Sequence, residues 1–244
     1  MVVFKVCEVL PDCFTSSQMK LDIKRVPRHH ASEIHELSTL ALHACSVASD
    51  AAFNVKDFLL GSSPMAFLAA RDCEKELDRI EQQIDEELPW AISQVSEPQA
   101  RELLAASRFS TELERIGDLL FGVSKRLQNL RMPLSRGDMR HLATMLGVLE
   151  EMLKELRISF EGRELDGAKY VLGADREIDR IYKGFIGRHL AVDDIDRMQQ
   201  STEVLLIAQV LERAGDHATN LAEELFRLVE GRSLRHSPKR ERQD

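Results

Sequence analysis

Apolar residues recur every three or four positions along most of the chain, which is the spacing of one face of an α-helix. This pattern begins near Ala31 and continues to about Gly231. Between the apolar positions the sequence is rich in charged residues and alanine, a mixture that favours helices over sheets. The pattern therefore predicts an all-α protein.

Short polar segments divide the pattern into six predicted helices. GSSP at 61–64 and SEPQ at 96–99 each place a capping serine close to a proline suited to a first helical turn, and MPLSRGD at 132–138 is the clearest linker. Pro89 either lies at the end of the second helix or kinks it, with continuation to about Val95. The predicted helices cover about 31–60, 64–88 or 64–95, 97–130, 138–161, 164–190 and 193–230.

Two pairs of segments repeat with nearly the same offset. ELERIGDLLFGVSKRL at 112–127 is matched 98 positions later by VLERAGDHATNLAEEL at 210–225. EKELDRIEQQI at 74–84 is matched 101 positions later by DREIDRIYKGFI at 175–186. Two independent pairs with similar offsets indicate a duplicated unit of about 100 residues.

The duplication and the linker together predict the domain organisation. With three helices on each side of the linker, the expected fold is two tandem three-helix bundles related by an internal repeat. The first repeat covers 31–131 and the second 138–231. Residues 1–30 show no sustained helical period and are expected to form a leader, and 232–244 a basic, disordered tail.

Each repeated segment carries two acids four residues apart. Such residues lie on one face of a helix, so two of these helices side by side would bring four carboxylates together. That arrangement is costly unless cations neutralise it or some carboxyls are protonated, and hard cations prefer oxygen ligands. The candidate metal ligands are Glu74, Asp78, Glu114 and Asp118 in the first half, and Asp175, Asp179, Glu212, Asp216 and Asn220 in the second.

The repeat carries more weight than any single acid pair. In a chain with 41 acids, about seven pairs at this spacing are expected by chance, and most such pairs are simply solvated. Gly117 and Gly215 add support because glycine inside a helix costs about 1 kcal/mol relative to alanine. Its presence at the same place in both repeats predicts the close approach of a neighbouring helix or a ligand.

Charge and cysteine content narrow the class of protein. The net charge is −8, and both ends of the chain are basic, so the body is strongly acidic, which argues against nucleic acid as a partner and is compatible with cations. The four cysteines lack paired spacing and are expected to be free thiols. No apolar run approaches the ~20 residues of a membrane span, and we expect a cytoplasmic protein.

At the LER-x-GD segments the sequence resembles the PhoU family. The match runs through Glu114 and Asp118 in one half and Glu212, Asp216 and Asn220 in the other, while Gly122 stands where the second repeat has Asn220. The resemblance implies multinuclear clusters of iron, zinc, manganese or magnesium. It also implies a regulator of phosphate uptake and signalling that links a phosphate transporter to a membrane sensor kinase, with dimerisation and peripheral membrane association expected.

Two other functions stay open at this point. Carboxylate clusters on helices also serve metalloenzymes such as phosphohydrolases and oxidases, although the acid–x–x–His string formed by Asp138 and His141 lies outside the repeats and no Ser/His/Asp arrangement stands out. The other alternative is a helical scaffold protein that binds no metal, in which the acids are simply solvated. We favour a non-enzymatic regulator, and we expect Asn220 to make the second metal site the tighter one.

Overall fold

The computed structural model describes residues 30–190 and 195–231, so nearly all of the predicted leader and the whole basic tail lie outside the described residues. The described residues form six α-helices and no strand, which confirms the predicted all-α fold of two tandem three-helix bundles. The helices are α1 (His30–Gly61), α2 (Pro64–Ile92), α3 (Glu97–Gln128), α4 (Arg136–Gly162), α5 (Asp166–His189) and α6 (Ile195–Glu230).

Two helices begin directly after the predicted capping serines: α2 after Ser63 and α3 after Ser96. Helix α3 begins after Ser96, whose backbone N–H donates to the side-chain oxygen of Gln99 at 3.0 Å. Helix α4 begins two residues before the predicted start because Ser135 caps it, accepting from the backbone N–H of Asp138 at 3.0 Å. Pro89 does not end α2, which continues to Ile92, so the continuing helix is the correct alternative.

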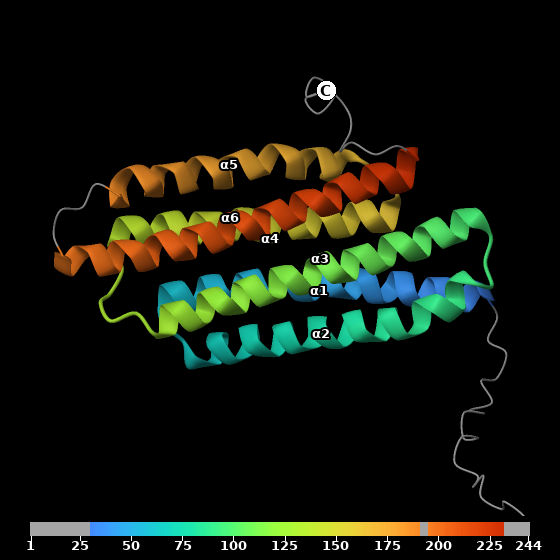
Figure 1. Ribbon diagram of the computed structural model, residues 1–244, viewed down its shortest axis with the longest axis horizontal. Helices are drawn as coiled ribbons and strands as arrows, with labels where there is room; N and C mark the ends of the chain where they lie inside the picture. The colour runs from blue at the N-terminus through green and yellow to red at the C-terminus, as the bar shows by residue number, and fades with distance from the viewer. Residues whose placement is uncertain (1–29, 191–194, 232–244) are drawn as a thin grey trace, which may run out of the picture.

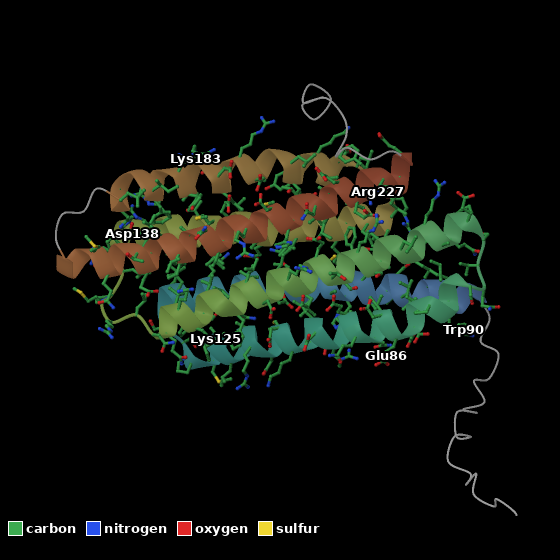
Figure 2. The ribbon with its side chains drawn as sticks, in the orientation of Figure 1. Glu86, Trp90, Lys125, Asp138, Lys183 and Arg227 are labelled. Carbon is green, nitrogen blue, oxygen red and sulfur yellow. The ribbon has the colours of Figure 1, made fainter. Side chains whose placement is uncertain are left out.

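The two bundles lie side by side with their long axes roughly parallel (Figure 1). Helices α1, α2 and α3 pack together, as do α4, α5 and α6, and the bundles meet where α1 contacts α4 and α3 contacts α6. Helices α2 and α5 are therefore the outer edges of the molecule. The charged residues labelled on them, Glu86 and Lys183, point away from the body (Figure 2).

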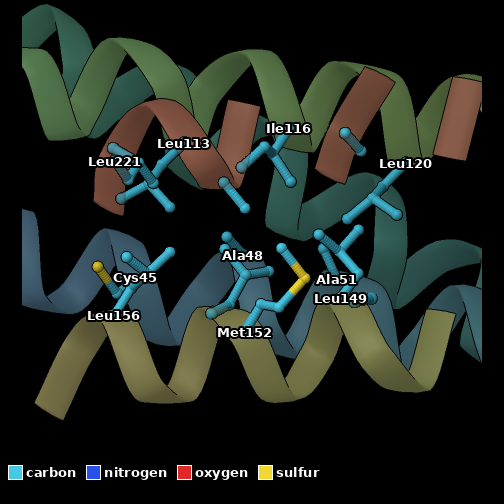
Figure 3. Close-up of a cluster of buried hydrophobic side chains, with 14 of the residues drawn as sticks. Cys45, Ala48, Ala51, Leu113, Ile116, Leu120, Leu149, Met152, Leu156 and Leu221 are labelled. Carbon is cyan, nitrogen blue, oxygen red and sulfur yellow. The ribbon is translucent and has the colours of Figure 1, made fainter. Parts of the chain in front are cut away.

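One continuous apolar core joins the two bundles. At its centre, residues of α1, α3, α4 and α6 interdigitate, among them Ala48, Ile116, Met152 and Leu221 (Figure 3). The buried residues of α1 include many alanines, whose small side chains let the neighbouring helices approach closely. The repeats are thus two units in sequence that share one core in space.

None of the helices in the described part of the chain has an apolar stretch that could cross a membrane. Their buried apolar residues face the shared core, and charged residues occupy many of the exposed positions.

Candidate metal centres

The first candidate site lies along the contact between α2 and α3. Leu77 of α2 and Ile116 of α3 are buried in the core. Acidic residues at neighbouring helical positions are left at the edge of this contact, where they are partly or fully exposed. They are the four acids predicted as ligands in the first half: Glu74, Asp78, Glu114 and Asp118. We call this line of acids between α2 and α3 the first groove, and the matching line between α5 and α6 the second groove.

The carboxyl groups of this first groove are close enough to change one another's ionisation. Burial, together with the charges of Asp118, Glu81 and Asp78, raises the pKa of Glu114 to about 7. Burial and the charges of Asp118 and Asp78 also raise the pKa of Glu74. Because a nearby cation would relieve this repulsion, the groove suits a positively charged ligand.

Glu81 is a further acid of the first groove that the repeat does not reveal. One carboxylate oxygen each from Asp78, Glu81 and Glu114 lie within 4.8 Å of one another, a spacing that a single cation could bridge. Glu81 follows Asp78 by three residues and Glu74 by seven, so all three share one face of α2. That spacing is the signal in the sequence, but Tyr182 occupies the corresponding place in the second half and hides it from a comparison of repeats.

The second candidate site lies along the contact between α5 and α6. Burial and the charges of Asp179, Asp216 and Glu212 raise the pKa of Asp175 to about 6. Burial is also the main cause that raises the pKa of Glu212 and of Asp216, followed in each case by neighbouring acids of the same groove. The structure therefore brings together the four predicted acids of the second half as well.

Two further contacts distinguish the second groove. The ammonium group of Lys183 lies 3.2 Å from a carboxylate oxygen of Asp179. The amide nitrogen of Asn220 donates to Glu112 of α3 at 3.2 Å, and the same carboxylate oxygen lies 2.6 Å from Nδ1 of His217. One end of the Asn220 amide is thus directed toward the contact between the two bundles.

Two glycines allow the helices of each groove to approach. A methyl group at Gly117 would stand 2.5 Å from Cδ1 of Leu77. At Gly215 it would stand 3.0 Å from Oδ1 of Asp175 and 3.2 Å from Cδ1 of Ile178. The prediction that these glycines mark the close approach of a neighbouring helix is confirmed.

The same duplication defines the family. The PhoU domain family profile matches the chain twice, over residues 35–127 and 142–225. The chain belongs to the PhoU family. The first match falls within the helices α1 to α3 and the second within α4 to α6, so the family's domain corresponds to one bundle.

Several PhoU proteins are similar to this chain in sequence. It is 33% identical over 165 residues to the phosphate-specific transport system accessory protein PhoU homolog of Rhizobium meliloti, covering 64% of this chain and 68% of that protein. It is 28% identical over 174 residues to the homolog of the same name from Pseudomonas aeruginosa, covering 68% and 71%.

Solved PhoU structures share the fold. The crystal structure of PhoU from Pseudomonas aeruginosa superposes with a TM-score of 0.73 at 22% identity, covering 84% of this chain and 100% of that one. The phosphate transport system regulatory protein PhoU from Streptococcus pneumoniae also gives 0.73, at 21% identity, covering 84% and 99%. Paired three-helix bundles are therefore common to all three proteins.

A Ser–His–Asp hydrogen-bond chain, which the sequence did not single out, lies at one end of the second PhoU domain. Nε2 of His189 is 3.1 Å from Oδ1 of Asp138, and its Nδ1 is 3.1 Å from Oγ of Ser201. These residues come from three different helices. Ser201 is only 7% exposed, and these contacts join the ends of α4, α5 and α6.

Proposed function

We propose that this chain is a non-enzymatic regulator of phosphate uptake and phosphate signalling that binds metal in its two acidic grooves. In this proposal it works in the cytoplasm as an adaptor between a phosphate transporter and a membrane sensor kinase. The metal is a multinuclear centre of iron, zinc, manganese or magnesium.

The observation that carries the metal-binding part is the crowding of acids in each groove. Glu114 and Asp175 have pKa values raised to about 7 and about 6, in part by the acids around them. A folded protein gains nothing from such repulsion in itself, whereas carboxylate oxygens at this spacing are good ligands for hard cations. The same crowding of carboxylates recurs in both halves, which supports cation binding as the common role of the two grooves.

Membership of the family supports the phosphate-related part. The relatives from Rhizobium meliloti and Pseudomonas aeruginosa are named as accessory proteins of a phosphate-specific transport system. We extend that role to this chain, and the link to a sensor kinase is what resemblance to the PhoU family implies. Deleting the gene in the cells that produce the protein should leave phosphate uptake unrestrained when phosphate is plentiful. Uptake that is unchanged under those conditions would contradict the proposal.

Metal binding is tested on protein purified without chelator. Elemental analysis should find a di- or trivalent transition metal or magnesium, and adding Mn²⁺, Zn²⁺ or Fe³⁺ to stripped protein should raise its melting temperature by mass action. Glu114→Gln should remove binding from the first groove alone and Glu212→Gln from the second alone. If the melting temperature of the metal-free protein does not change with any of these ions, the proposal that the grooves bind metal is wrong.

The absence of catalysis is tested separately, because a carboxylate-bridged metalloenzyme is the competing function. We expect metal-loaded protein to hydrolyse no phosphate ester and to oxidise no substrate. A metal-dependent phosphatase or oxidase activity that disappears in Asp216→Asn would establish the enzyme instead. An esterase activity lost in Ser201→Ala would point to the hydrogen-bond chain at the end of the second bundle.

A further inference from the structure

A pocket with a volume of about 770 Å³ lies where the first bundle passes into the second. Its walls are the last turn of α3, the residues that follow it and the early turns of α6. Its described lining includes the cations Lys125, Arg126 and Arg131, after which we call it the basic pocket. Among the same described residues Glu203 is the acid, and Leu130 and Met132 are apolar. Lys125 lies near the end of α3, close to the linker (Figure 2).

The basic pocket keeps an excess of positive charge. Arg126 pairs with Glu203 at 3.5 Å, which accounts for the pocket's acid. The ammonium group of Lys125 lies 4.3 Å from the ring centroid of Phe121. Its charge also acts on Glu74 of the first groove, so Lys125 is shared between the pocket and that groove. Arg131 is exposed and has no ion-pair partner within the part of the chain that the structure describes. The pocket is thus a region of local positive charge on a protein whose net charge is −8.

The shape and lining of the pocket suit a segment of polypeptide. Its volume falls in the range of about 300–1,000 Å³ that is usual for concave binding sites. The amide of Gln200 donates to the backbone oxygen of Pro133 at 2.7 Å, which holds the linker against α6. Met132 is 52% exposed beside the cations, and methionine adapts its flexible side chain to varied apolar surfaces.

Charge identifies the kind of occupant. The chain's own ends do not fit, because 1–30 and 232–244 each carry more lysine and arginine than acid. A flat lipid surface does not enter a concave pocket. Acidic segments recognised by clusters of basic side chains are a recurring mode of protein recognition, and the apolar lining adds a requirement for apolar side chains.

We propose that the basic pocket binds an acidic segment with interspersed apolar side chains from a partner protein. This rests on the proposed adaptor function, since an adaptor needs a surface for its partner. Cations attract the acids of the segment, and Leu130 and Met132 contact its apolar side chains. The pocket includes both α3 and α6, so an occupant would contact both bundles at once.

Fluorescence anisotropy with the full chain tests this proposal. The probe is a short fluorescein-labelled peptide of alternating glutamate and leucine, compared with peptides in which glutamine replaces glutamate or serine replaces leucine. We expect only the first peptide to bind, with an affinity that falls as salt is raised. Arg131→Glu should weaken binding about fivefold, the upper range for one exposed charge pair, and Met132→Ser should weaken it as well. Lys169→Glu, the same charge change at an exposed position of α5, is the matched control and should bind as the parent does.

Three outcomes would overturn the proposal. The first is failure of the acidic peptide to bind, or equal weakening by Arg131→Glu and Lys169→Glu. The second is binding to vesicles of phosphatidylcholine and phosphatidylglycerol, lost in Arg131→Glu, without peptide binding, which would assign the pocket to a lipid surface. The third is a dimer that dissociates in Arg131→Glu, which would assign it to a second copy of the chain. Stripped protein is used throughout, so these results are independent of whether the grooves bind metal.

Discussion

The two acidic grooves have the same four-acid pattern but different surroundings. The first groove has a fifth acid, Glu81, and one of its carboxylate oxygens lies within 4.8 Å of an oxygen of Asp78 and of Glu114. The second groove has Tyr182 at the corresponding position. In the second groove Lys183 lies against Asp179, and the Asn220 amide nitrogen donates to Glu112 across the contact between the bundles. Duplication preserved the four acid positions, whereas the neighbouring positions diverged. If the grooves bind metal as proposed, those neighbours would set the difference in affinity between them.

This comparison changes the expected order of the two sites. The sequence favours the second groove as the tighter metal site because Asn220 adds an oxygen where Gly122 adds none. The contacts in the structure favour the first, because Glu81 adds a fifth carboxylate there, whereas in the second groove the ammonium group of Lys183 lies directly against Asp179. The charges of Lys125 and Lys75 also act on Glu74 in the first groove, and they offset part of this difference.

Alanine at the paired glycines should have its largest effect in the first half. The added methyl of Gly117→Ala would stand 2.5 Å from Leu77, which is 1% exposed in the core. Overpacking of this kind costs about 1–3 kcal/mol. Gly122→Ala in the same helix meets nothing within 4 Å and should instead gain up to about 1 kcal/mol of helix propensity. Urea unfolding of the two variants measures the difference, and equal stabilities would show that α2 can move aside without cost.

The corresponding change in the second half should act on metal more than on stability. The methyl of Gly215→Ala would press on Oδ1 of Asp175 at 3.0 Å and on the end of Ile178 at 3.2 Å. These distances require only a small shift of each side chain, so the loss of stability should be smaller than for Gly117→Ala. Metal titration should nevertheless show weaker binding, because Asp175 is displaced. Unchanged affinity would remove Asp175 from the ligand set.

Variants at the positions that differ between the grooves test the reversed order directly. Glu81→Gln keeps the shape of the side chain but removes its charge, and it should weaken binding in the first groove about tenfold, the lower end of the range for groups that support a metal site. Asn220→Gly should have a smaller effect, because the Asn220 side chain carries no charge that a cation would lose, whereas Glu81→Gln removes a full negative charge. Both are titrated with Mn²⁺ at fixed pH and ionic strength. A larger loss in Asn220→Gly would restore the order expected from the sequence.

The sequence predicted the fold well because its signals are local and repeated. Apolar spacing marked the helices, and serine and proline marked the starts of α2 and α3. The spacing of Glu81 from Glu74 and Asp78 places it on their face of α2, but the sequence could not show that it lies close to Glu114. Nor could it show the direction of the Asn220 amide, because both depend on how far one helix is rotated against its neighbour. The same holds for the hydrogen bonds of His189, whose partners are 12 and 51 positions away.

The last and smallest expected effect is the pH dependence of metal-free stability. The pKa of Glu114 is about 7 in the folded protein, against 4.5 as its ordinary value. Between these values the folded state binds more protons than the unfolded state, so the free energy of unfolding falls as pH rises from about 4.5 to about 7 and then levels off. Asp175 adds a similar fall between 3.8 and about 6. The effect is modest because both carboxyls are partly exposed and screened by solvent.

Glu114→Gln should remove the upper part of this fall in stability and Asp175→Asn the lower part, in urea titrations of stripped protein across this pH range. Saturating metal should reverse the trend, because the cation favours the ionised carboxylates and binds more tightly as they lose their protons. A stripped protein whose stability rises steadily from pH 4.5 to 7 would show that repulsion in the grooves is relieved without metal.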